Sequence, residues 1–345
     1  MKPVAAGLPD GRLVVVTPVF EDTEACVRLF RELAAIADCR AYVVAVDDGS
    51  VHRPLDVGVI AAAGIDGAVI RLRRNVGHQG AIAVGLNHVV AHIGNAGRVV
   101  VMDSDGEDLP QSIGKLLQPL ESPVVDVVVA RRMRRVESFR FRLFYLVYKL
   151  LFSILTGRKI NFGNFMALKP AAAKRIVAMR ELGTHVAGCV LLSRLRIAFC
   201  PIDRGPRYAG SSSMSFVNLV LHGFKALMVF AEDVLVRVGL ACALVAAFSL
   251  VGAAAAIVLK LSGYATPGWL SITLGILLLV FLQMGTLTLV TLMLTGVVRG
   301  GFVTTAGWDE VIASVTYTHA DSALGAAGGL QADSGVPVRE AATAA

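Results

Sequence analysis

Charged residues are scarce in this chain, and two long stretches contain none. Asp, Glu, Lys and Arg make up 17% of the 345 residues, against 55% for hydrophobic residues. The mean hydropathy of +0.66 is too high for an ordinary soluble enzyme. The uncharged stretches, 238–259 and 269–298, each exceed the ~20 apolar residues that span a bilayer as a helix. They predict a transmembrane hairpin of two helices.

Cysteines are also few, and the five present are scattered along the chain. Their odd number and irregular spacing argue against a disulfide framework and against a zinc module, and fit a reducing cytoplasm. The opening "MKPVAAGLPDGRL" lacks an apolar core, so we expect no secretory signal sequence.

Basic residues are missing from the loop between the two uncharged stretches. Arg237 and Arg299 flank the opposite ends, so the positive-inside rule places both ends of the hairpin in the cytoplasm. Lys260 borders the loop, where a lysine can snorkel to the interface. The formal net charge is +7, and the basic residues cluster beside membrane-facing segments, which argues against a nucleic-acid partner. We therefore expect a multi-pass protein of the inner cell membrane with a cytoplasmic catalytic domain.

Residues 10–210 alternate Val-rich strand-like runs with helix-like segments. This pattern predicts an α/β domain built on a mostly parallel sheet with helices on both faces. In such sheets ligands bind beyond the carboxyl ends of the strands. Three predicted strands end there in polar residues, at Thr17-Pro18, Asp47-Asp48 and Asp103–Asp105. One shared pocket is the simplest interpretation.

The stretch "VVVMDSDGEDLP", from Val99 to Pro110, runs from a buried-looking strand into four carboxylates. Such a cluster is costly unless an arginine, a helix N-terminus or a metal ion compensates it. An acidic turn in which Asp108 caps a helix beginning near Pro110 is the structural alternative. A nicotinamide site is excluded, because "GHQGAIAVG" does not follow the first strand, which ends in "TPVFED".

Five motifs resemble those of family 2 glycosyltransferases, in the family's order: "VVVTPVFED", "VVAVDDGS", "RNVGHQGAIAVGL", "VVVMDSDGEDLP" and "ARRMRR". The chain is most similar to the polyprenyl-phosphate branch, which includes dolichol-phosphate mannose synthases and bactoprenol glucosyltransferases. The resemblance covers about residues 12–237 and implies the GT-A fold. It also implies inverting transfer of a sugar from a nucleotide diphosphate to a polyprenyl phosphate, such as undecaprenyl or dolichyl phosphate.

The resemblance also assigns candidate site residues. Asp103 and Asp105 would be catalytic and would hold Mg²⁺ or Mn²⁺, which prefer hard oxygen ligands. For Asp47 and Asp48, a turn without a ligand is the alternative. The expected nucleotide-sugar-binding residues are Pro18, Phe20, Glu21, Asp47, Asp48, Asn75, Gly77, Asp103, Ser104, Asp105 and Arg207.

Arginines follow the strand-like "VDVVVA". Arg131, Arg134 and Arg135 are expected to bind the acceptor phosphate, with Arg131 and Arg134 also catalytic. A solvated basic face is the alternative. The next segment, 139–155, has the aromatic, apolar and basic composition of a helix lying in the lipid headgroup region. A second such helix is predicted over 216–236, with Asn218, His222 and Lys225 on one face and His222 as an interfacial polar residue.

A lipid phosphate is largely dianionic at neutral pH and can attack without a protein base. A hydroxyl acceptor needs a base, for which only Glu107 or Asp108 is at hand, and the Gln-x-x-Arg-Trp signature of processive synthases is absent. Transfer to a hydroxyl of a glycolipid or envelope glycan stays open, as does a non-catalytic nucleotide-binding subunit. Two departures from related enzymes stand out: Asn164 replaces the Asp of Gly-Asp-Phe, and Ser213 replaces the Lys of Gly-x-Ser-Lys.

The predicted organisation has four parts. Residues 1–212 form the cytoplasmic glycosyltransferase domain, and 213–237 form an amphipathic interfacial helix. The hairpin occupies 238–298, and a cytoplasmic tail, 299–345, is disordered from about residue 320. A homo-oligomer is compatible with this organisation.

Overall fold

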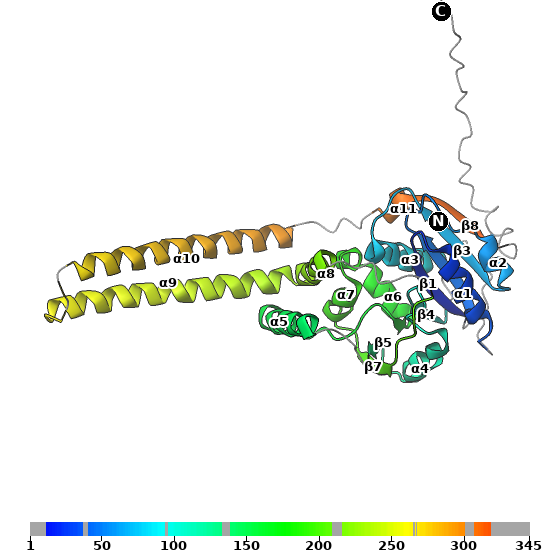
Figure 1. Cartoon of the computed structure of the whole chain (residues 1–345), viewed down its shortest axis with the longest axis horizontal. Coiled ribbons are helices and arrows are strands. Elements are labelled where there is room, and N and C mark those ends of the chain that lie inside the picture. Colours follow the sequence, from blue (N-terminus) through cyan, green and yellow to red (C-terminus); the bar gives the residue numbers. More distant parts are fainter. Residues whose placement is uncertain are drawn as a thin grey trace, which may run out of the picture.

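The computed structural model describes residues 12–36, 41–93, 96–132, 139–208, 216–264, 266, 268–300 and 307–318. In this part of the chain the strands form one sheet in the order β7-β5-β6-β4-β1-β2-β3-β8 (Figure 1). Their bounds are β1 Leu13–Val19, β2 Ala41–Asp47, β3 Asp66–Leu72, β4 Arg98–Val101, β5 Val127–Arg132, β6 Met166–Leu168, β7 Ile197–Ile202 and β8 Ile312–Tyr317.

Most strand pairs in the sheet are parallel. β1 pairs in parallel with β2 and β4, β2 with β3, and β5 with β7. The short β6 runs antiparallel to β4 and β5, and β8 runs antiparallel to β3. All seven residues of β1 and of β2 are buried, as expected for strands covered on both faces. The prediction of a mostly parallel α/β sheet is confirmed.

Helices cover both faces of this sheet. Successive side chains of β1 alternate between two cores, with Val14 and Val16 in one and Val15 in the other. The first core includes α3 (His78–His92), α6 (Pro170–Val177) and α7 (Val186–Leu192), and the second includes α1 (Thr23–Ala34), α2 (Gly58–Ala62) and α4 (Ile113–Leu117). Helix α3 lies close to the sheet because Gly85 faces Val16, whose Cγ1 would lie 2.5 Å from an added Cβ.

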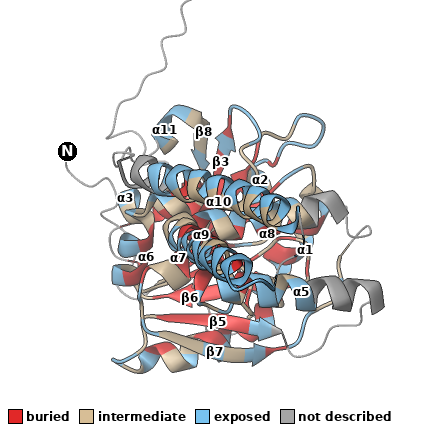
Figure 2. Cartoon of the chain, turned by 90° about the vertical axis from the view of Figure 1, so that its left-hand side faces the viewer, coloured by how far each residue is buried: buried red, intermediate tan, exposed pale blue. Residues whose placement is uncertain are grey.

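Two long helices, α9 (Ala231–Leu261) and α10 (Trp269–Gly300), run side by side away from the sheet domain (Figures 1 and 2). Both are long and apolar enough to cross a membrane. They contain the predicted stretches 238–259 and 269–298. Small residues bring them together: the Thr288 hydroxyl donates to the Gly239 carbonyl at 3.4 Å. Their remaining surface is largely exposed, as Figure 2 shows, which suits a lipid environment.

Helices α5 (Phe139–Thr156) and α8 (Phe216–Val229) lie at the domain end of the hairpin (Figure 1). They share a small core of Phe152, Ala226, Val229 and Phe230. Large apolar side chains remain exposed on both helices: Leu146, Val147, Leu150, Leu151 and Ile154 on α5, and Leu221, Phe224 and Met228 on α8. The single helix predicted over 216–236 is wrong in extent, because α8 ends at Val229 and α9 begins at Ala231.

After the hairpin the chain returns to the sheet. The short α11 (Trp308–Val311) leads into β8, and an added Cβ on Gly183 would lie 2.6 Å from the Trp308 ring. The Gly67 N–H donates to the Thr318 hydroxyl at 3.1 Å, and the Thr318 N–H donates to the Gly67 carbonyl at 3.0 Å. The predicted tail, 299–345, therefore omitted a strand that belongs to the sheet domain. The part predicted to be disordered, from residue 320, lies outside the described residues.

Candidate active site

Polar side chains gather at the carboxyl ends of β1, β2 and β4. Val19 at the end of β1 pairs with Asp47 at the end of β2. On the other side of β1, the Ser104 hydroxyl donates to the Pro18 carbonyl at 3.2 Å. The three strand ends predicted to share one edge of the sheet are therefore adjacent, where parallel sheets bind their ligands.

The acidic loop, residues 103–108, folds back on itself after β4. The Asp108 carboxylate accepts the Asp103 N–H, and the Asp105 carboxylate accepts the Glu107 N–H, both at 3.0 Å. Gly106 has a φ of +89°, and a Cβ there would lie 2.7 Å from the Tyr208 ring, so this position requires glycine. Asp108 closes its own loop, and Leu109 occupies the N-cap position of the turn at Pro110.

A basic loop, residues 203–208, follows β7 and covers the acidic loop. Arg207 contacts the carboxylates of Asp105 at 3.0 Å and Glu107 at 3.1 Å. Arg204 forms an ion pair with Glu107. Backbone contacts join the same two loops, because the Tyr208 N–H donates to the Asp105 carbonyl at 2.8 Å. In this structure arginine side chains are therefore the principal compensation for the acidic strand end.

Asp105 nevertheless remains in an unfavourable position for a negative charge. Burial raises its pKa, and the charge of Asp103 raises it further, while Arg207 and Arg204 oppose this rise. The net pKa shift is upward, so another positive charge beside these two carboxylates would stabilise their ionised forms.

His78, the first residue of α3, is a site residue that sequence reasoning missed. Its Nε2 lies 3.1 Å from Asp103 Oδ1 and 3.0 Å from the side-chain nitrogen of Asn164. Burial lowers the pKa of His78, but the charge and hydrogen bond of Asp103, together with the charges of Asp105 and Asp108, outweigh it, and the pKa is raised. The available signal was the position of His78 in the "RNVGHQG" motif, directly after the predicted nucleotide-binding Gly77.

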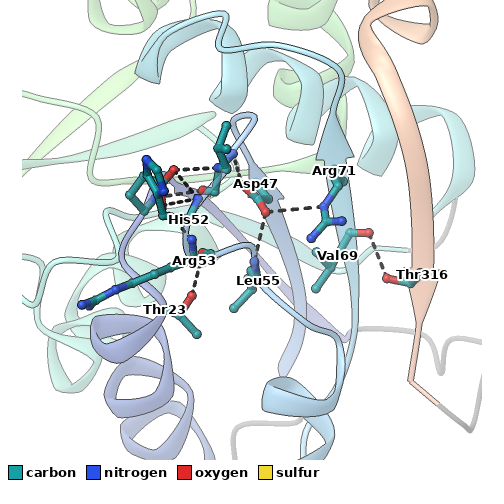
Figure 3. A network of polar contacts seen from close by, with 11 residues as sticks. Thr23, Asp47, His52, Arg53, Leu55, Val69, Arg71 and Thr316 are labelled. Atoms are coloured by element: carbon teal, nitrogen blue, oxygen red, sulfur yellow. Dashed lines mark hydrogen bonds and ion pairs between the residues drawn. The ribbon is translucent and has the colours of Figure 1, made fainter.

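Glu21 and Asp47 build the loop between β2 and α2 (Figure 3). The Glu21 carboxylate accepts the backbone N–H groups of Val51, His52 and Arg53, which lower its pKa. Glu21 has a φ of +53°, an uncommon conformation for a residue with a side chain. The Asp47 carboxylate is fully buried and accepts the Leu55 N–H at 3.0 Å. Asp47 therefore holds this loop in place, and its contact with a nucleotide stays a prediction.

Asp48 holds the start of α3 in place. Its carboxylate accepts the N–H groups of Val76 at 2.7 Å and Gly77 at 3.0 Å. Burial raises its pKa even though these hydrogen bonds oppose the shift. The Asn75 side chain also accepts the Gly77 N–H, at 3.0 Å. Asp48, Asn75 and Gly77 are thus brought together, and direct contact with a nucleotide stays a prediction for all three.

The remaining predicted residues differ in placement. Phe20 is 52% exposed beside the strand ends, and Pro18 is buried within β1. Arg131 is exposed near the end of β5, next to a small open pocket. The residues that line this pocket are Glu107, Asp108, Ala130, Gly163, Phe165, Ile202, Asp203 and Arg204. Arg134 and Arg135 lie outside the described residues.

The donor chemistry of Asp103 and Asp105 fits a hard divalent cation. Both offer carboxylate oxygens, and burial, followed by the charge of Asp103, raises the pKa of Asp105, so a cation between them would stabilise its ionised form. Among the described residues no three His, Cys, Asp or Glu side chains converge as a metal site. A cation here would take its other ligands from phosphate and water, as Mg²⁺ commonly does.

Comparison with known proteins gives a consistent assignment. Residues 14–182 match the model of glycosyl transferase family 2. Undecaprenyl-phosphate 4-deoxy-4-formamido-L-arabinose transferases of Salmonella paratyphi A and Salmonella enteritidis PT4 are 25% identical over 221 residues. The match covers 61% of this chain and spans 65% of the length of these curated relatives.

Among solved structures, glucosyl-3-phosphoglycerate synthase from Mycobacterium tuberculosis, with Mn²⁺ and UDP-glucose, is 15% identical at a TM-score of 0.45. That similarity covers 67% of this chain and 80% of the synthase. The family match comprises β1 to α6 and includes the acidic loop, His78 and Asn164. Residues 14–182, which contain the acidic loop, are therefore similar to glycosyl transferase family 2.

Proposed function

We propose that this protein transfers a sugar from a nucleotide diphosphate to a polyprenyl phosphate at the membrane surface, with inversion at the anomeric carbon. The observation that carries the proposal is the pair Asp103 and Asp105 at the carboxyl edge of a sheet domain that is similar to family 2 and continues into an apolar hairpin. The named activity of the Salmonella relatives, which act on undecaprenyl phosphate, supports this acceptor.

On the donor side, Asp103 and Asp105 would hold Mg²⁺ or Mn²⁺ at the diphosphate. The cation would neutralise the charge that develops on the departing nucleotide. Arg207 pairs with Asp105 in this structure, and its guanidinium fits phosphate oxygens equally well. A bound donor would therefore compete with Asp105 for Arg207 and draw the basic loop over the diphosphate. Pro18, Phe20, Glu21, Asp47, Asp48, Asn75, Gly77 and Ser104 would shape the nucleoside pocket.

On the acceptor side, the arrangement favours a phosphate over a hydroxyl. A hydroxyl needs a base, but Asp108 is engaged by the Asp103 N–H, and Glu107 is engaged by two arginines. Both carboxylates already hold donors, and the two arginines favour the ionised form of Glu107, which makes it a weaker base. A phosphate dianion supplies its own nucleophilic oxygen. Arg131, at the end of β5, would bind the acceptor phosphate, and the same role is proposed from the sequence for Arg134 and Arg135.

The path of the chain supports an even number of membrane crossings. Helix α9 follows α8, which packs against the sheet domain, and β8 returns to the same sheet after α10. Because β8 hydrogen-bonds to β3, both ends of the hairpin would lie on the side of the sheet domain. The uncharged loop between α9 and α10 would then face away from the cytoplasm.

The proposed function is tested by measuring sugar transfer to a lipid phosphate directly. Full-length protein in detergent would be incubated with undecaprenyl phosphate, Mg²⁺ or Mn²⁺, and a panel of radiolabelled nucleotide sugars. We expect label to enter a lipid-soluble product. Chelation by EDTA, or the Asp105→Asn substitution, should reduce transfer about a hundredfold or more, since metal stabilisation supplies several kcal/mol. The exposed Asp309→Asn serves as the matched control. Label transferred only to a glycan hydroxyl would support the alternative acceptor instead.

A further inference from the structure

Helix α10 exposes a polar side chain within the stretch that is long and apolar enough to cross a membrane. Gln283 is exposed, and within the described part of the chain its amide has no hydrogen-bond partner. On α9, by contrast, every exposed residue between 238 and 259 is Ala, Val, Leu, Ile or Phe. Helix α10 therefore differs from α9 in presenting an amide on its outer surface.

The contacts within the hairpin place Gln283 at the depth of the lipid hydrocarbon. The Thr288 hydroxyl donates to the Gly239 carbonyl, and Gly239 follows Arg237 by two residues. At 1.5 Å per residue, Gln283 lies about 10 Å further into the hairpin than Arg237 and about 21 Å from Trp269 at the other end. Together these distances match the ~30 Å thickness of the hydrocarbon layer. An amide without a partner is costly there, because no water is available to bond it.

The face of α10 that contains Gln283 is turned away from α9. Leu277 and Thr291 lie against glycines of α9, on the opposite side of α10. The outward face includes exposed residues that recur at intervals of three and four: Ile276, Leu279, Gln283, Thr286, Val290 and Met293. This spacing is typical of helices that pack against each other along their length. The outward face of α10 is therefore shaped for another helix, with the amide near its middle.

A second copy of the chain supplies what Gln283 lacks. A carboxamide both donates and accepts hydrogen bonds, so two Gln283 side chains can pair with each other. All copies insert in the same orientation, and a twofold axis along the membrane normal brings the two amides to the same depth. The Thr286 hydroxyl donates to the Leu282 carbonyl at 2.8 Å and keeps its lone pairs for an amide of the other copy.

We propose that the outward face of α10 is the interface of a homodimer, in which two parallel α10 helices pair through Gln283. Interhelical hydrogen bonds between amide side chains are a recognised means of association in membranes. This inference rests on the membrane crossing in the proposed function, and is independent of the sugar and the acceptor. Both sheet domains would lie on the same side of the membrane.

The first test measures self-association of the full-length protein in mild detergent, by light scattering over a range of concentrations. We expect the wild type to have the protein mass of a dimer. Gln283→Leu nearly keeps the size of the side chain and removes its hydrogen bonds, so the dissociation constant should rise about three- to thirtyfold. The control is Leu244→Ala on the exposed face of α9, which should leave the constant unchanged.

The second test uses disulfide crosslinking in native membranes. Leu244 and Gln283 lie at the same depth, because each is five residues from the contact between Gly239 and Thr288. In a variant whose five natural cysteines are alanine, Gln283→Cys should form a covalent dimer on oxidation with copper phenanthroline, and Leu244→Cys should not.

Three results would overturn the interface: a monomeric wild type, equal crosslinking at both positions, or a different membrane protein crosslinked to Gln283→Cys in place of a second copy. Sugar transfer to undecaprenyl phosphate, measured on the same preparations, keeps the two proposals apart. A monomer that transfers sugar would overturn the interface alone, and a crosslinked dimer that transfers none would overturn the proposed function alone.

Discussion

Thr318 offers a quantitative test of whether the segment after the hairpin belongs to the catalytic domain. Its side chain is 5% exposed, and its hydroxyl accepts the Gly67 N–H at 3.1 Å. Thr318→Val keeps the shape but removes the acceptor, so a buried N–H loses its partner. This costs about 1–3 kcal/mol. For a domain of roughly 200 residues, each kcal/mol lowers the Tm by about 2–4 °C, which gives a decrease of about 2–12 °C.

The same strand contains the matched control. Thr316 is exposed, and its hydroxyl donates to the Val69 carbonyl at a long 3.4 Å (Figure 3). Thr316→Val should change the free energy of unfolding by less than about 0.5 kcal/mol. Unfolding of the full-length protein in detergent would be followed by tryptophan fluorescence at a fixed heating rate. Trp308, packed on Gly183, reports on this region. Equal Tm values for wild type and Thr318→Val would refute the assignment of β8 as a stabilising strand.

Two further expectations follow from the charges of the chain. Arg196 hydrogen-bonds to Asp126 and lowers the pKa of that carboxyl to about 2, so Asp126→Asn should lower the urea midpoint near pH 7. The ion pair stabilises the folded state fully above the ordinary Asp pKa of about 4, and this stabilisation is lost as the pH falls through about 2. The urea midpoints of wild type and Asp126→Asn should therefore converge in acid. A constant difference between the two midpoints at all pH values would contradict this reasoning. In a variant whose five natural cysteines are alanine, Tyr264→Cys should react with an impermeant thiol reagent in whole cells and Ala313→Cys should not. The opposite labelling would reverse the proposed orientation.

Local patterns in the sequence were sufficient for the layers of the fold. Val-rich runs alternate with amphipathic segments, and hydrophobic burial alone requires such strands to be covered on both faces. The hairpin was equally evident, since few structures other than membrane-spanning helices accommodate two uncharged stretches of bilayer length. The division of 216–236 at Phe230 was not evident, because α8 and α9 are both apolar and their boundary depends on packing against Phe152.

The candidate site was predictable where function depends on a short motif. Asp103 and Asp105 stand out because carboxylates at a strand end need compensation, and the order of five motifs indicated which chemistry uses them. The identity of the compensating groups was not predictable. Arg204 and Arg207 follow the acidic loop by about 100 residues, and only the pairing of β5 with β7 brings the basic loop to it.

By itself, the sequence determined which residue types are available for chemistry and which stretches must be buried in protein or lipid. Both properties depend on side-chain composition over short ranges. Only the tertiary structure decided which of those residues meet. It placed His78 against Asp103, joined His185 to His222, and returned β8 to the sheet after the membrane hairpin. These contacts connect segments far apart in the chain, and no local periodicity carries them. Their physical basis is the packing of helices and loops onto one sheet, which β8 joins from the other side of the hairpin.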